Sequence, residues 1–467
     1  MKKTEGKFGT GSVLSLDAIG KQDTYLIDKD NSLFISNHAT VQHSKFAITE
    51  RTTRVDSPGN ADSHPNWPFG QEIVITLKPR NMSDLLSNMF LKCELPVLKD
   101  KDSYDAGYTD QLGRTLIDTA SFRVDTIEIE KLHNDWGIIR DELFLNEEQK
   151  DANKFLINAG QDYGNLPGSR VLVDGEWEGS AVGSVALYIP LNFFFTRKHA
   201  RLTHKADAYF KPYFPLCAIT KNEIKLTIVF NPVSYFARTR RDVSLSKFEI
   251  VTEEITVTDA ERYFLQTQAT EITVETVRRN PVLEIFPSSS NAKMFLVSDI
   301  PIKSIFWFFR DVRYDRKDAF RLFEADVYLQ RYNFSASSTE NTDVHAQKFY
   351  PIMSDATLVI NGKQEEGFME NLGNKTSIHT SNYFKHELPR KYKMSSPNRN
   401  IYTYSFALDP LNPEPTGAMD FSKLPASRSF IEVSLMANLD ATRSYNMHVY
   451  YTGYKTLKFA DGHMSIS

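Results

Sequence analysis

Apolar and polar residues alternate with a period of two along much of the chain. The clearest alternations lie in residues 72–78, 91–95, 223–230, 402–406 and 431–435. In a strand, successive side chains point to opposite faces, so each alternation predicts a sheet with one packed face and one wetter face. The continuous apolar run Ile305–Phe309 predicts a buried strand.

Turn-forming residues separate these segments. They include Ser57–Asn60, Asp174-Gly175, Asn361-Gly362, Asn412-Pro413 and Asp461-Gly462. Asn361-Gly362 directly follows an apolar run and predicts a tight hairpin turn. Many short strands with this spacing indicate a β-sandwich or barrel and disfavour a doubly wound α/β fold.

Helical patterns are few. Asp135–Asn153 carries apolar residues at helical spacing, beginning with Trp136, and predicts an amphipathic helix or two short helices. Ser83–Asn88 could form a single turn. Asp259–Gln268 is a third candidate helix, with Asp259 as its expected N-cap.

The least regular central stretch is Asn231–Asp242, which contains a proline and a basic cluster of Arg238, Arg240 and Arg241. We interpret it as a linker between two all-β halves. The basic cluster fits a solvated connector better than a nucleic-acid contact.

Composition narrows the class of function. Lys and Arg total 55 against 59 Asp and Glu, a formal net charge of -4, so a protein that coats DNA by charge alone is not expected. The 32 Phe and 21 Tyr favour pleated, half-buried surfaces. Only Cys93 and Cys217 occur, which excludes a disulfide framework and predicts two buried thiols.

Targeting signals are not expected either. Met1-Lys2-Lys3 is followed by polar residues instead of the apolar core of a signal peptide. No apolar run approaches the roughly 20 residues that a membrane helix needs.

The search for catalytic chemistry finds no motif. His38 and His43 are five residues apart, as are His199 and His204, which is not the spacing of a helical zinc site. The acidic pairs at 147–148, 253–254 and 365–366 are expected to lie on solvated faces. We therefore predict no catalytic, cofactor-binding or metal-binding residues, which favours a binding or structural role.

The C-terminal part carries the sharpest resemblance to a known family. Ile401–Pro410, Pro415–Gly417 and Phe421–Leu424 resemble the Tyr-Ser-Phe-Ala-Leu-x-Pro, Pro-Ser/Thr-Gly and Phe-Ser-Arg elements of double jelly-roll major capsid proteins. These proteins form the shells of large eukaryotic double-stranded DNA viruses of the iridovirus and chlorella-virus type. Further segments that are similar in family order are Leu14–Leu26, Asp84–Pro96, Trp136–Leu143, Pro190–Thr196, Glu254–Phe264, Leu358–Gly362 and Arg443–Gly453. Lys198–Phe214 departs from the family by being longer, basic and aromatic.

The resemblance implies an all-β fold of two tandem eight-stranded antiparallel jelly-roll sandwiches, with a few short helices in connecting loops. The expected organisation is an inward-facing N-terminal arm at 1–30, a first jelly roll at 31–235, a linker at 236–250 and a second jelly roll at 251–467.

The function implied is that of a structural protein, not an enzyme, with no cofactor. Three copies would form a pseudo-hexameric capsomer that tiles an icosahedral shell in the virion, assembled in the host cell cytoplasm. Expected partners are two further copies, neighbouring capsomers, minor capsid and penton proteins and internal membrane proteins, without sequence-specific nucleic acid. The alternatives are a carbohydrate-binding or deglycosylating protein, since tandem jelly rolls occur there too, and a minor capsid or penton protein, which the length disfavours.

Overall fold

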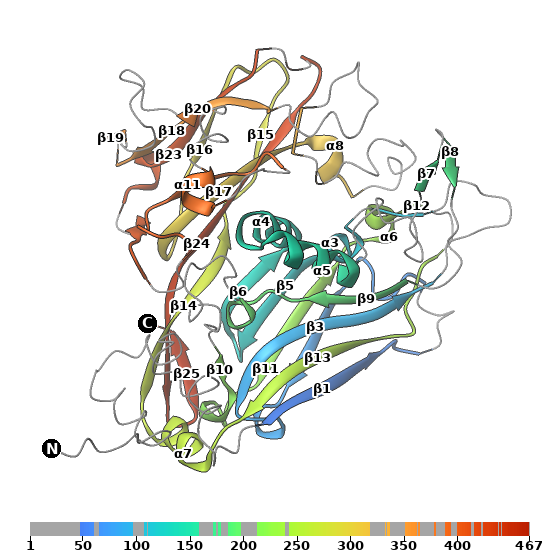
Figure 1. Cartoon of the computed structure of the whole chain (residues 1–467), viewed down its shortest axis with the longest axis vertical. Coiled ribbons are helices and arrows are strands. Elements are labelled where there is room, and N and C mark those ends of the chain that lie inside the picture. Colours follow the sequence, from blue (N-terminus) through green and yellow to red (C-terminus); the bar gives the residue numbers. More distant parts are fainter. Residues whose placement is uncertain are drawn as a thin grey trace. The chain divides into compact units, whose positions relative to one another are not determined.

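The chain separates into two compact units in the computed structural model (Figure 1). The structure describes residues 47–59, 65–96, 107–109, 111–157, 171–173, 176–178, 185–197, 213–238, 242–317, 332, 334–336, 351–361, 363–364, 378–379, 388–393, 399–411, 415–421, 424–437, 439 and 441–466. Unit 1 comprises 1–134, 146–276 and 455–467, and unit 2 comprises 135–145 and 277–454. The predicted N-terminal arm at 1–30 lies outside the described residues.

Unit 1 is built on two antiparallel sheets. The first contains β1 (Ala47–Asp56), β13 (Lys247–Thr256), β3 (Leu85–Leu95), β9 (Val185–Pro190) and the short β10 (Phe214–Pro215). The second contains β2 (Glu72–Leu77), β11 (Ile224–Phe230), β5 (Ile117–Val124) and β6 (Ile127–His133). Phe230 of β11 meets Phe248 of β13 with ring centroids 5.4 Å apart, so the two sheets pack face to face.

The strand order of unit 1 is that of a jelly roll. Of its eight main strands in chain order, the first, eighth, third and sixth (β1-β13-β3-β9) form one sheet. The second, seventh, fourth and fifth (β2-β11-β5-β6) form the other. Neighbouring strands that are distant in sequence are the mark of Greek-key connections between facing sheets.

Aromatic side chains fill the interior of unit 1. Phe122 of β5 is fully buried, and its ring centroid lies 5.1 Å from that of Phe195 and 5.4 Å from that of Phe214. Phe193 and Phe194 complete this group at 5.5 and 6.1 Å. Edge-to-face and tilted pairs of this kind add to the stabilisation that comes from burial itself.

Short elements complete unit 1. They are β4 (Gly107–Tyr108) paired with β12 (Ala237–Arg238), β7 (Val171–Val173) paired with β8 (Glu176–Glu178), α3 (Leu112–Leu116), α5 (Glu147–Ile157), α6 (Val233–Phe236), α7 (Asp259–Thr267), and the 3-10 turns η3 (Pro79–Asn81), η4 (Phe194–Thr196) and η6 (Leu216–Ala218).

Unit 2 repeats the same strand order. One sheet contains β14 (Thr270–Arg279), β24 (Tyr445–Ala460), β17 (Pro301–Asp311) and β21 (Tyr402–Ser405), with β15 (Leu283–Ile285), β22 (Met419–Asp420) and β25 (His463–Ile466) at its margins. The other contains β16 (Asn291–Phe295), β23 (Phe430–Leu435), β18 (Met353–Ile360), β19 (Lys363–Gln364) and β20 (Ile378–His379). The first parts of β14 and the last parts of β24, together with β25, belong to unit 1. The smaller elements are α8 (Val312–Asp315), α11 (Leu388–Tyr392) and η11 (Ala426–Arg428).

The all-β, two-sandwich prediction is therefore confirmed, and several of its details are too. Ile305–Phe309 lies within β17 and is buried throughout. The tight turn after Ile360 joins β18 to β19, where Asn361 adopts the left-handed backbone with φ 50°. Cys93 and Cys217 are both free and buried.

Helix α4 (Asn134–Phe144) covers a sheet of unit 2, although it directly follows β6 of unit 1 in the chain. Trp136 is 2% exposed, and its ring centroid lies 5.7 Å from that of Phe306 on β17. Phe144 lies 5.9 Å from the same ring and 6.0 Å from Tyr392 of α11. As a result β17 is buried on both of its faces, and only its first residue, Pro301, is exposed.

The structure divides the chain differently from the expected boundaries. The predicted linker at 236–250 runs into β13, which is the eighth strand of the first sandwich and pairs with β1 and β3. Phe248 and Ile250 alternate with polar residues in this strand and are buried. The basic stretch before the strand is what indicated a linker at this point.

Two local predictions were wrong. Ser83–Asn88 does not form a turn of helix, because β3 begins at Leu85 and the helical turn lies earlier, at Pro79–Asn81. The N-cap of α7 is Thr258 instead of Asp259. Thr258 forms a capping box with Glu261, in which each side chain satisfies the other residue's backbone N–H.

Replacing Trp136 with alanine is expected to lower the free energy of unfolding by about 3–5 kcal/mol, because the change leaves a cavity against β17. Tyr263→Ala is the matched control: this α7 side chain is 70% exposed, and its loss should cost less than about 0.5 kcal/mol. Urea denaturation followed by circular dichroism measures both. Identical unfolding curves for Trp136→Ala and the parent chain would contradict the packing of α4.

Candidate functional site

The described residues hold no group of three His, Cys, Asp or Glu side chains that could bind a metal ion. None of their helices is both long and apolar enough to cross a membrane. The two histidine pairs singled out in the sequence lie outside the described residues. The search for a functional centre therefore turns to polar groups that the fold buries.

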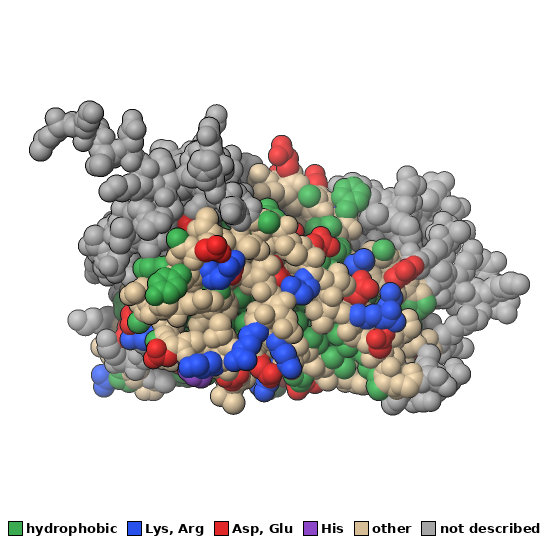
Figure 2. All heavy atoms as spheres, turned by 90° about the horizontal axis from the view of Figure 1, so that it is seen from below, with side chains coloured by type: hydrophobic (Ala, Val, Ile, Leu, Met, Phe, Trp, Pro, Cys, Tyr) green, Lys and Arg blue, Asp and Glu red, His purple; other side chains and the backbone are tan. Residues whose placement is uncertain are grey.

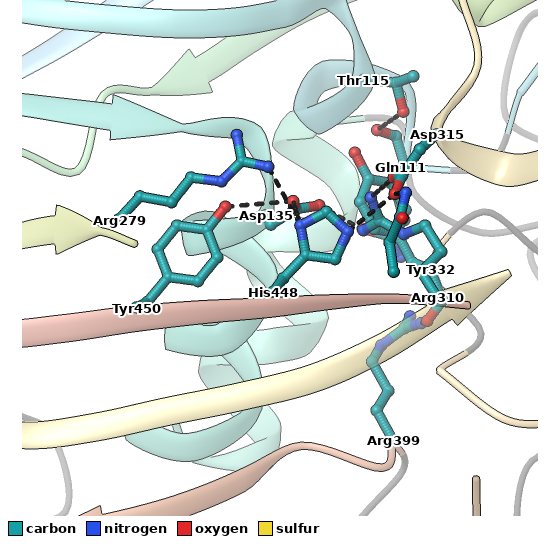
Figure 3. Close-up of polar contacts among 11 residues, drawn as sticks. Gln111, Thr115, Asp135, Arg279, Arg310, Asp315, Tyr332, Arg399, His448 and Tyr450 are labelled. Atoms are coloured by element: carbon teal, nitrogen blue, oxygen red, sulfur yellow. Dashed lines mark hydrogen bonds and ion pairs between the residues drawn. The ribbon is translucent and has the colours of Figure 1, made fainter. Parts of the chain in front are cut away.

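A cluster of charged and polar side chains is buried in unit 2 between α4 and the sheet beneath it (Figure 3). This ionic cluster consists of Asp135, Arg279, Arg310, Asp315, Asn446, His448 and Tyr450. They come from α4, β14, β17, α8 and β24. Asp135, Arg310 and His448 are each at most 2% exposed.

Arg310 is the centre of the ionic cluster. Its Nη2 donates to Asp135 Oδ1, and its Nη1 donates to Asp315 Oδ1 at 2.6 Å. The Tyr450 hydroxyl donates to Asp135 Oδ2 at 3.2 Å. The Arg310 guanidinium on β17 thus contacts one carboxylate on α4 and one on α8. Its planar set of N–H donors allows both contacts at once.

Both ring nitrogens of His448 have a partner in the ionic cluster. An arginine can only donate, so the 3.1 Å contact between Arg279 Nη2 and His448 Nδ1 requires a lone pair on Nδ1. The ring proton then lies on Nε2, which donates to Asp315 Oδ2 at 2.8 Å. His448 thus bridges Arg279 and Asp315 within the ionic cluster.

Both carboxylates of the cluster are held ionised. Burial opposes the charged form of Asp315, but its contacts with His448 and Arg310 and the hydrogen bond from Asn446 outweigh that cost, and its pKa lies well below the ordinary value. Burial opposes the charge of Asp135 as well, and Arg310 is the main group that keeps its pKa lowered. The pKa of Tyr450 is raised by burial and by the adjacent Asp135.

An aspartate, a histidine and a tyrosine in contact could be mistaken for catalytic machinery. Here the acceptor and donor positions of His448 are both occupied, by Arg279 and Asp315. The ring also stacks on Phe308 with centroids 4.9 Å apart. The contacts that would serve a substrate are used within the protein, so the ionic cluster fixes α4 on the sheet and does not perform a reaction.

A second buried ion pair lies in unit 1. Arg197 is 5% and Glu130 0% exposed, and Arg197 Nη2 donates to Glu130 Oε1. Glu130 Oε2 accepts from the backbone N–H of Phe194 at 2.8 Å, and Arg197 Nη1 donates to the Glu275 carbonyl at 2.8 Å. This pair holds the Pro190–Thr196 segment, one of the stretches that resemble the family, against β6.

A third ion pair fastens α7 within unit 1. Arg262 donates to both oxygens of Asp84, at 2.7 and 2.9 Å, and Asp84 Oδ2 also accepts from the backbone N–H of Val257 at 2.9 Å. Asp84 and Arg262 lie in two of the segments that resemble the family. Their spacing of 178 residues explains why no local pattern could join them.

One expectation about the acidic pairs was wrong. Glu254 was expected on a solvated face but is fully buried, and it accepts hydrogen bonds from Arg51 Nε and Thr252 Oγ1, both at 2.9 Å. The backbone N–H of Ser83 donates to its other oxygen at 2.7 Å. Glu254 therefore forms part of the core of unit 1.

Part of the segment with the sharpest resemblance lies between β21 and β22, where the structure describes residues 406–411 and 415–418. Thr416 Oγ1 donates to the carbonyl of Asp409 at 3.2 Å and accepts from its N–H at 3.3 Å. Gly417 has φ 146°, and a Cβ there would lie 2.9 Å from the carbonyl oxygen of Phe406. Glycine is required at this position because the backbone conformation and the space both exclude a side chain.

Charged residues on the surface are of both signs. On the face in Figure 2, lysine and arginine side chains lie with aspartate and glutamate side chains close by. This distribution agrees with the net charge of -4 and gives that face no single-sign field for a polyanion.

Two family models together match almost the whole chain. Residues 39–264 match the N-terminal part of major capsid proteins, and residues 261–465 match the large eukaryotic DNA virus major capsid protein. The chain belongs to this family of viral major capsid proteins. The two matches meet at 261–264, after β13, which agrees with the boundary given by the strand order.

Individual relatives agree with the family. The major capsid protein of Phaeocystis pouchetii virus is 22% identical over an alignment that covers 97% of this chain and 98% of the relative. The PBCV-1 virus capsid structure has a TM-score of 0.62 at 16% identity, covering 91% of this chain and 98% of that one. The Faustovirus major capsid protein has a TM-score of 0.61 at 10% identity, with 97% of each chain covered.

The capsid protein is thus a structural component of an icosahedral virion of a double-stranded DNA virus, and its family is not one of enzymes. The comparisons give no support to the alternative of a carbohydrate-binding or deglycosylating protein.

The buried ion pairs of this capsid protein were missed by sequence reasoning. The available signal was charge inside apolar runs: Arg310 directly follows the buried run of β17, and Asp135 precedes Trp136. Such residues are rarely buried without a partner. The sequence could therefore have predicted that they are paired, although not with which residue.

Asp135→Ala is expected to lower the free energy of unfolding by about 3–5 kcal/mol, because it removes one of the two carboxylates that pair with the buried Arg310. The double variant Asp135→Leu/Arg310→Met removes one charge of each sign and leaves Asp315 in contact with Asn446 and His448, so it should be more stable than Asp135→Ala alone. Asp259→Ala is the control: this carboxylate is 95% exposed in its pair with Arg262, and its loss should cost less than about 1 kcal/mol. Equal losses for the two single variants in urea denaturation would contradict the role of the ionic cluster.

The stability of the capsid protein should fall as the pH is lowered below about 4, because Asp135 and Asp315 have lowered pKa values when folded. Their stabilisation is present above the ordinary aspartate pKa and is lost as the pH falls through the lower folded values. Thermal unfolding between pH 7 and pH 2 tests this with Asp315→Asn. The variant should melt well below the parent at pH 7, and the two melting curves should converge towards pH 2. Parallel curves over the whole range would be evidence against it.

Proposed function

We propose that three copies of the capsid protein associate into a trimer that serves as a pseudo-hexameric capsomer. The observation that supports this is the repeated strand order: β1-β13-β3-β9 with β2-β11-β5-β6 in unit 1, and β14-β24-β17-β21 with β16-β23-β18-β19 in unit 2. Two similar sandwiches in each copy give six in a closed ring of three, so a three-fold particle can occupy a six-fold position in a shell.

A trimer with cyclic symmetry requires different patches of each copy to meet, since three-fold contacts are heterologous. An obligate interface of this type buries on the order of 2,000 Å² or more per pair and is fairly apolar. Exposed apolar side chains on the capsid protein, among them Ile48, Phe155, Phe286 and Leu408, are available for such contacts.

We further propose that the capsomers contact minor capsid and penton proteins, and internal membrane proteins on the inner side, and that assembly takes place in the host cytoplasm. These partners rest on the family alone. The near-neutral charge fits contacts between proteins better than direct binding of the genome.

Light scattering on the purified capsid protein tests the trimer. One chain weighs 53.4 kDa, so a particle of about 160 kDa is expected. The mass should persist on dilution through the micromolar range, as for an obligate interface. A monodisperse particle of 53.4 kDa would contradict the trimer, and negative-stain images without hexagonal outlines would contradict the capsomer shape.

A further inference from the structure

The equivalent sheets of the two sandwiches are buried to different extents. We call the sheets that contain β1 and β14 the first sheets, and those that contain β2 and β16 the second sheets. In unit 2, the outward side chains Phe306, Phe308 and Arg310 of β17 are buried, and α4 contacts the first and the last of them. In unit 1 the equivalent strand is β3, where Phe90 is half-buried and Lys92 is exposed on the outward side. The face that is fully buried in unit 2 is therefore only partly buried in unit 1.

The outward face of the first sheet of unit 1 carries two aromatic rings and two carboxylates side by side. Phe90 of β3 and Tyr188 of β9 have ring centroids 4.6 Å apart. Glu50 of β1 lies directly opposite Glu253 of β13 in the strand register. Partial burial and these two carboxylates raise the pKa of Tyr188, so all four side chains share one neighbourhood. We call Phe90, Tyr188, Glu50 and Glu253 the Glu50 face.

The negative charge of the Glu50 face is not neutralised within the chain. Like charges directly opposite each other in a sheet are destabilising. The cations on the same side of the sheet are already paired, Lys92 and Lys247 with Glu249 and Arg54 with Asp56. Glu253 accepts a hydrogen bond from Asn88, and no cation among the described residues pairs with Glu50. The Glu50 face therefore fits a partner that supplies both aromatic rings and a positive charge.

The second sheet of unit 2 carries that combination on its outward face. Phe295 of β16 is 45% exposed, and its ring centroid lies 5.9 Å from that of Phe430, which is opposite it on β23. The Lys293 ammonium lies 3.4 Å from the centroid of the Phe430 ring. Glu432 is opposite Lys293 in the register, but no ion pair joins them in the described structure. We call Lys293, Phe295 and Phe430 the Lys293 face; all three alternate with buried residues and so point outward.

The proposed ring of six sandwiches indicates which sides of neighbouring sandwiches meet. Within one chain, α4 follows β6, an edge strand of the second sheet of unit 1, and covers the first sheet of unit 2. Equivalent packing around the ring requires the second-sheet side of unit 2 to cover the first sheet of unit 1 in the next copy. The two faces also lie towards the same end of their sandwiches. Asn88, opposite Glu253, is near the start of β3, and β16 ends at Phe295 shortly before β17 begins.

We propose that the Lys293 face of one copy binds the Glu50 face of the next copy, with Lys293 beside Glu50 and Glu253 and the aromatic rings of the two faces packed together. The contact joins unit 2 to unit 1, as a ring in which the two kinds of sandwich alternate requires. It is heterologous, as every three-fold contact is. A second copy is the occupant because the charges of the two faces are complementary and one chain carries both. The inference rests on the proposed trimer and adds the residues that meet in it.

Zero-length crosslinking of the full-length parent chain tests the contact directly. A carbodiimide joins a lysine to a carboxylate without a spacer, so it links only groups that touch. The assembled protein is treated, digested and analysed by mass spectrometry, after assembly from a mixture of isotope-labelled and unlabelled chains. The expected product is an amide between Lys293 of one copy and Glu50 or Glu253 of another. Lys78, which is exposed on unit 1, is the matched control and should not link to either glutamate.

Charge reversal gives a second measurement, by sedimentation velocity over a dilution series. Lys293→Glu and Glu50→Lys should each weaken the association of copies on the order of 10- to 100-fold, because each places like charges across the contact. The double variant Lys293→Glu/Glu50→Lys restores opposite charges and should associate more tightly than either single variant, a recovery that a folding defect could not produce. Glu72→Lys, at the exposed first residue of β2, is the control and should associate like the parent chain.

The outcomes separate this contact from the trimer itself. If the parent chain is a trimer in which Lys293 links to neither glutamate, or links to them only within one copy, the contact is wrong and the trimer stands. The same holds if the single reversals associate as well as the parent, or if the double variant associates no better than they do. If the crosslink between copies and the recovery are both found in particles of another size, the contact stands and the trimer is wrong.

Discussion

The covering of β17 on both faces is the constraint on which unit 2 depends. A sandwich requires one buried face for each sheet, yet Phe306, Phe308 and Arg310 point away from the interior of this sandwich and are buried nonetheless. Phe308 stacks on Phe334. Phe306 and Arg310 are covered by α4, which the chain supplies from between β6 and α5, within the sequence of the first sandwich. The exchange also runs the other way, since 455–467 belongs to unit 1. No single cut in the sequence separates the two units, although the eight strands of each sandwich follow one another in the chain.

Burying the ionic cluster costs desolvation free energy, and what it provides in return is a defined position for α4. Burying two aspartates and two arginines is seldom more stable than apolar packing of the same volume, because desolvation offsets much of the attraction. What such a cluster provides is specificity: Arg310 donates to Asp135 in one position of α4, and a helix shifted by one turn would take Asp135 away from Arg310.

Local patterns in the sequence were enough to predict the fold class, but they could not predict which distant residues pair. Alternation predicted β2, β11 and β23, and the apolar run predicted β17, because side-chain direction in a strand depends only on position along it. The buried Trp136 and the family loop around Gly417 were likewise readable in short segments. The assignment of β13 to the first sandwich depends on pairing with β1, some 200 residues away in the chain. The partners of Asp84, Asp135 and Glu130 are also remote in sequence. A pattern within a short stretch of sequence could therefore not predict that these side chains are buried.

The kinds of polar contact that fix segments in the interior also fix segments at the surface. Buried ion pairs and side-chain hydrogen bonds hold individual segments in one conformation, as in the Asp409–Thr416 contacts beside Leu408. A pre-organised surface can use small apolar contacts, because little entropy is lost when they form. In a closed assembly each copy makes its contacts simultaneously, and modest contacts then act together with high effective concentration. Weak individual contacts also allow misplaced copies to dissociate before the shell closes. This chain has buried ion pairs in both units and exposed apolar side chains such as Ile48 and Leu408, and so has both features.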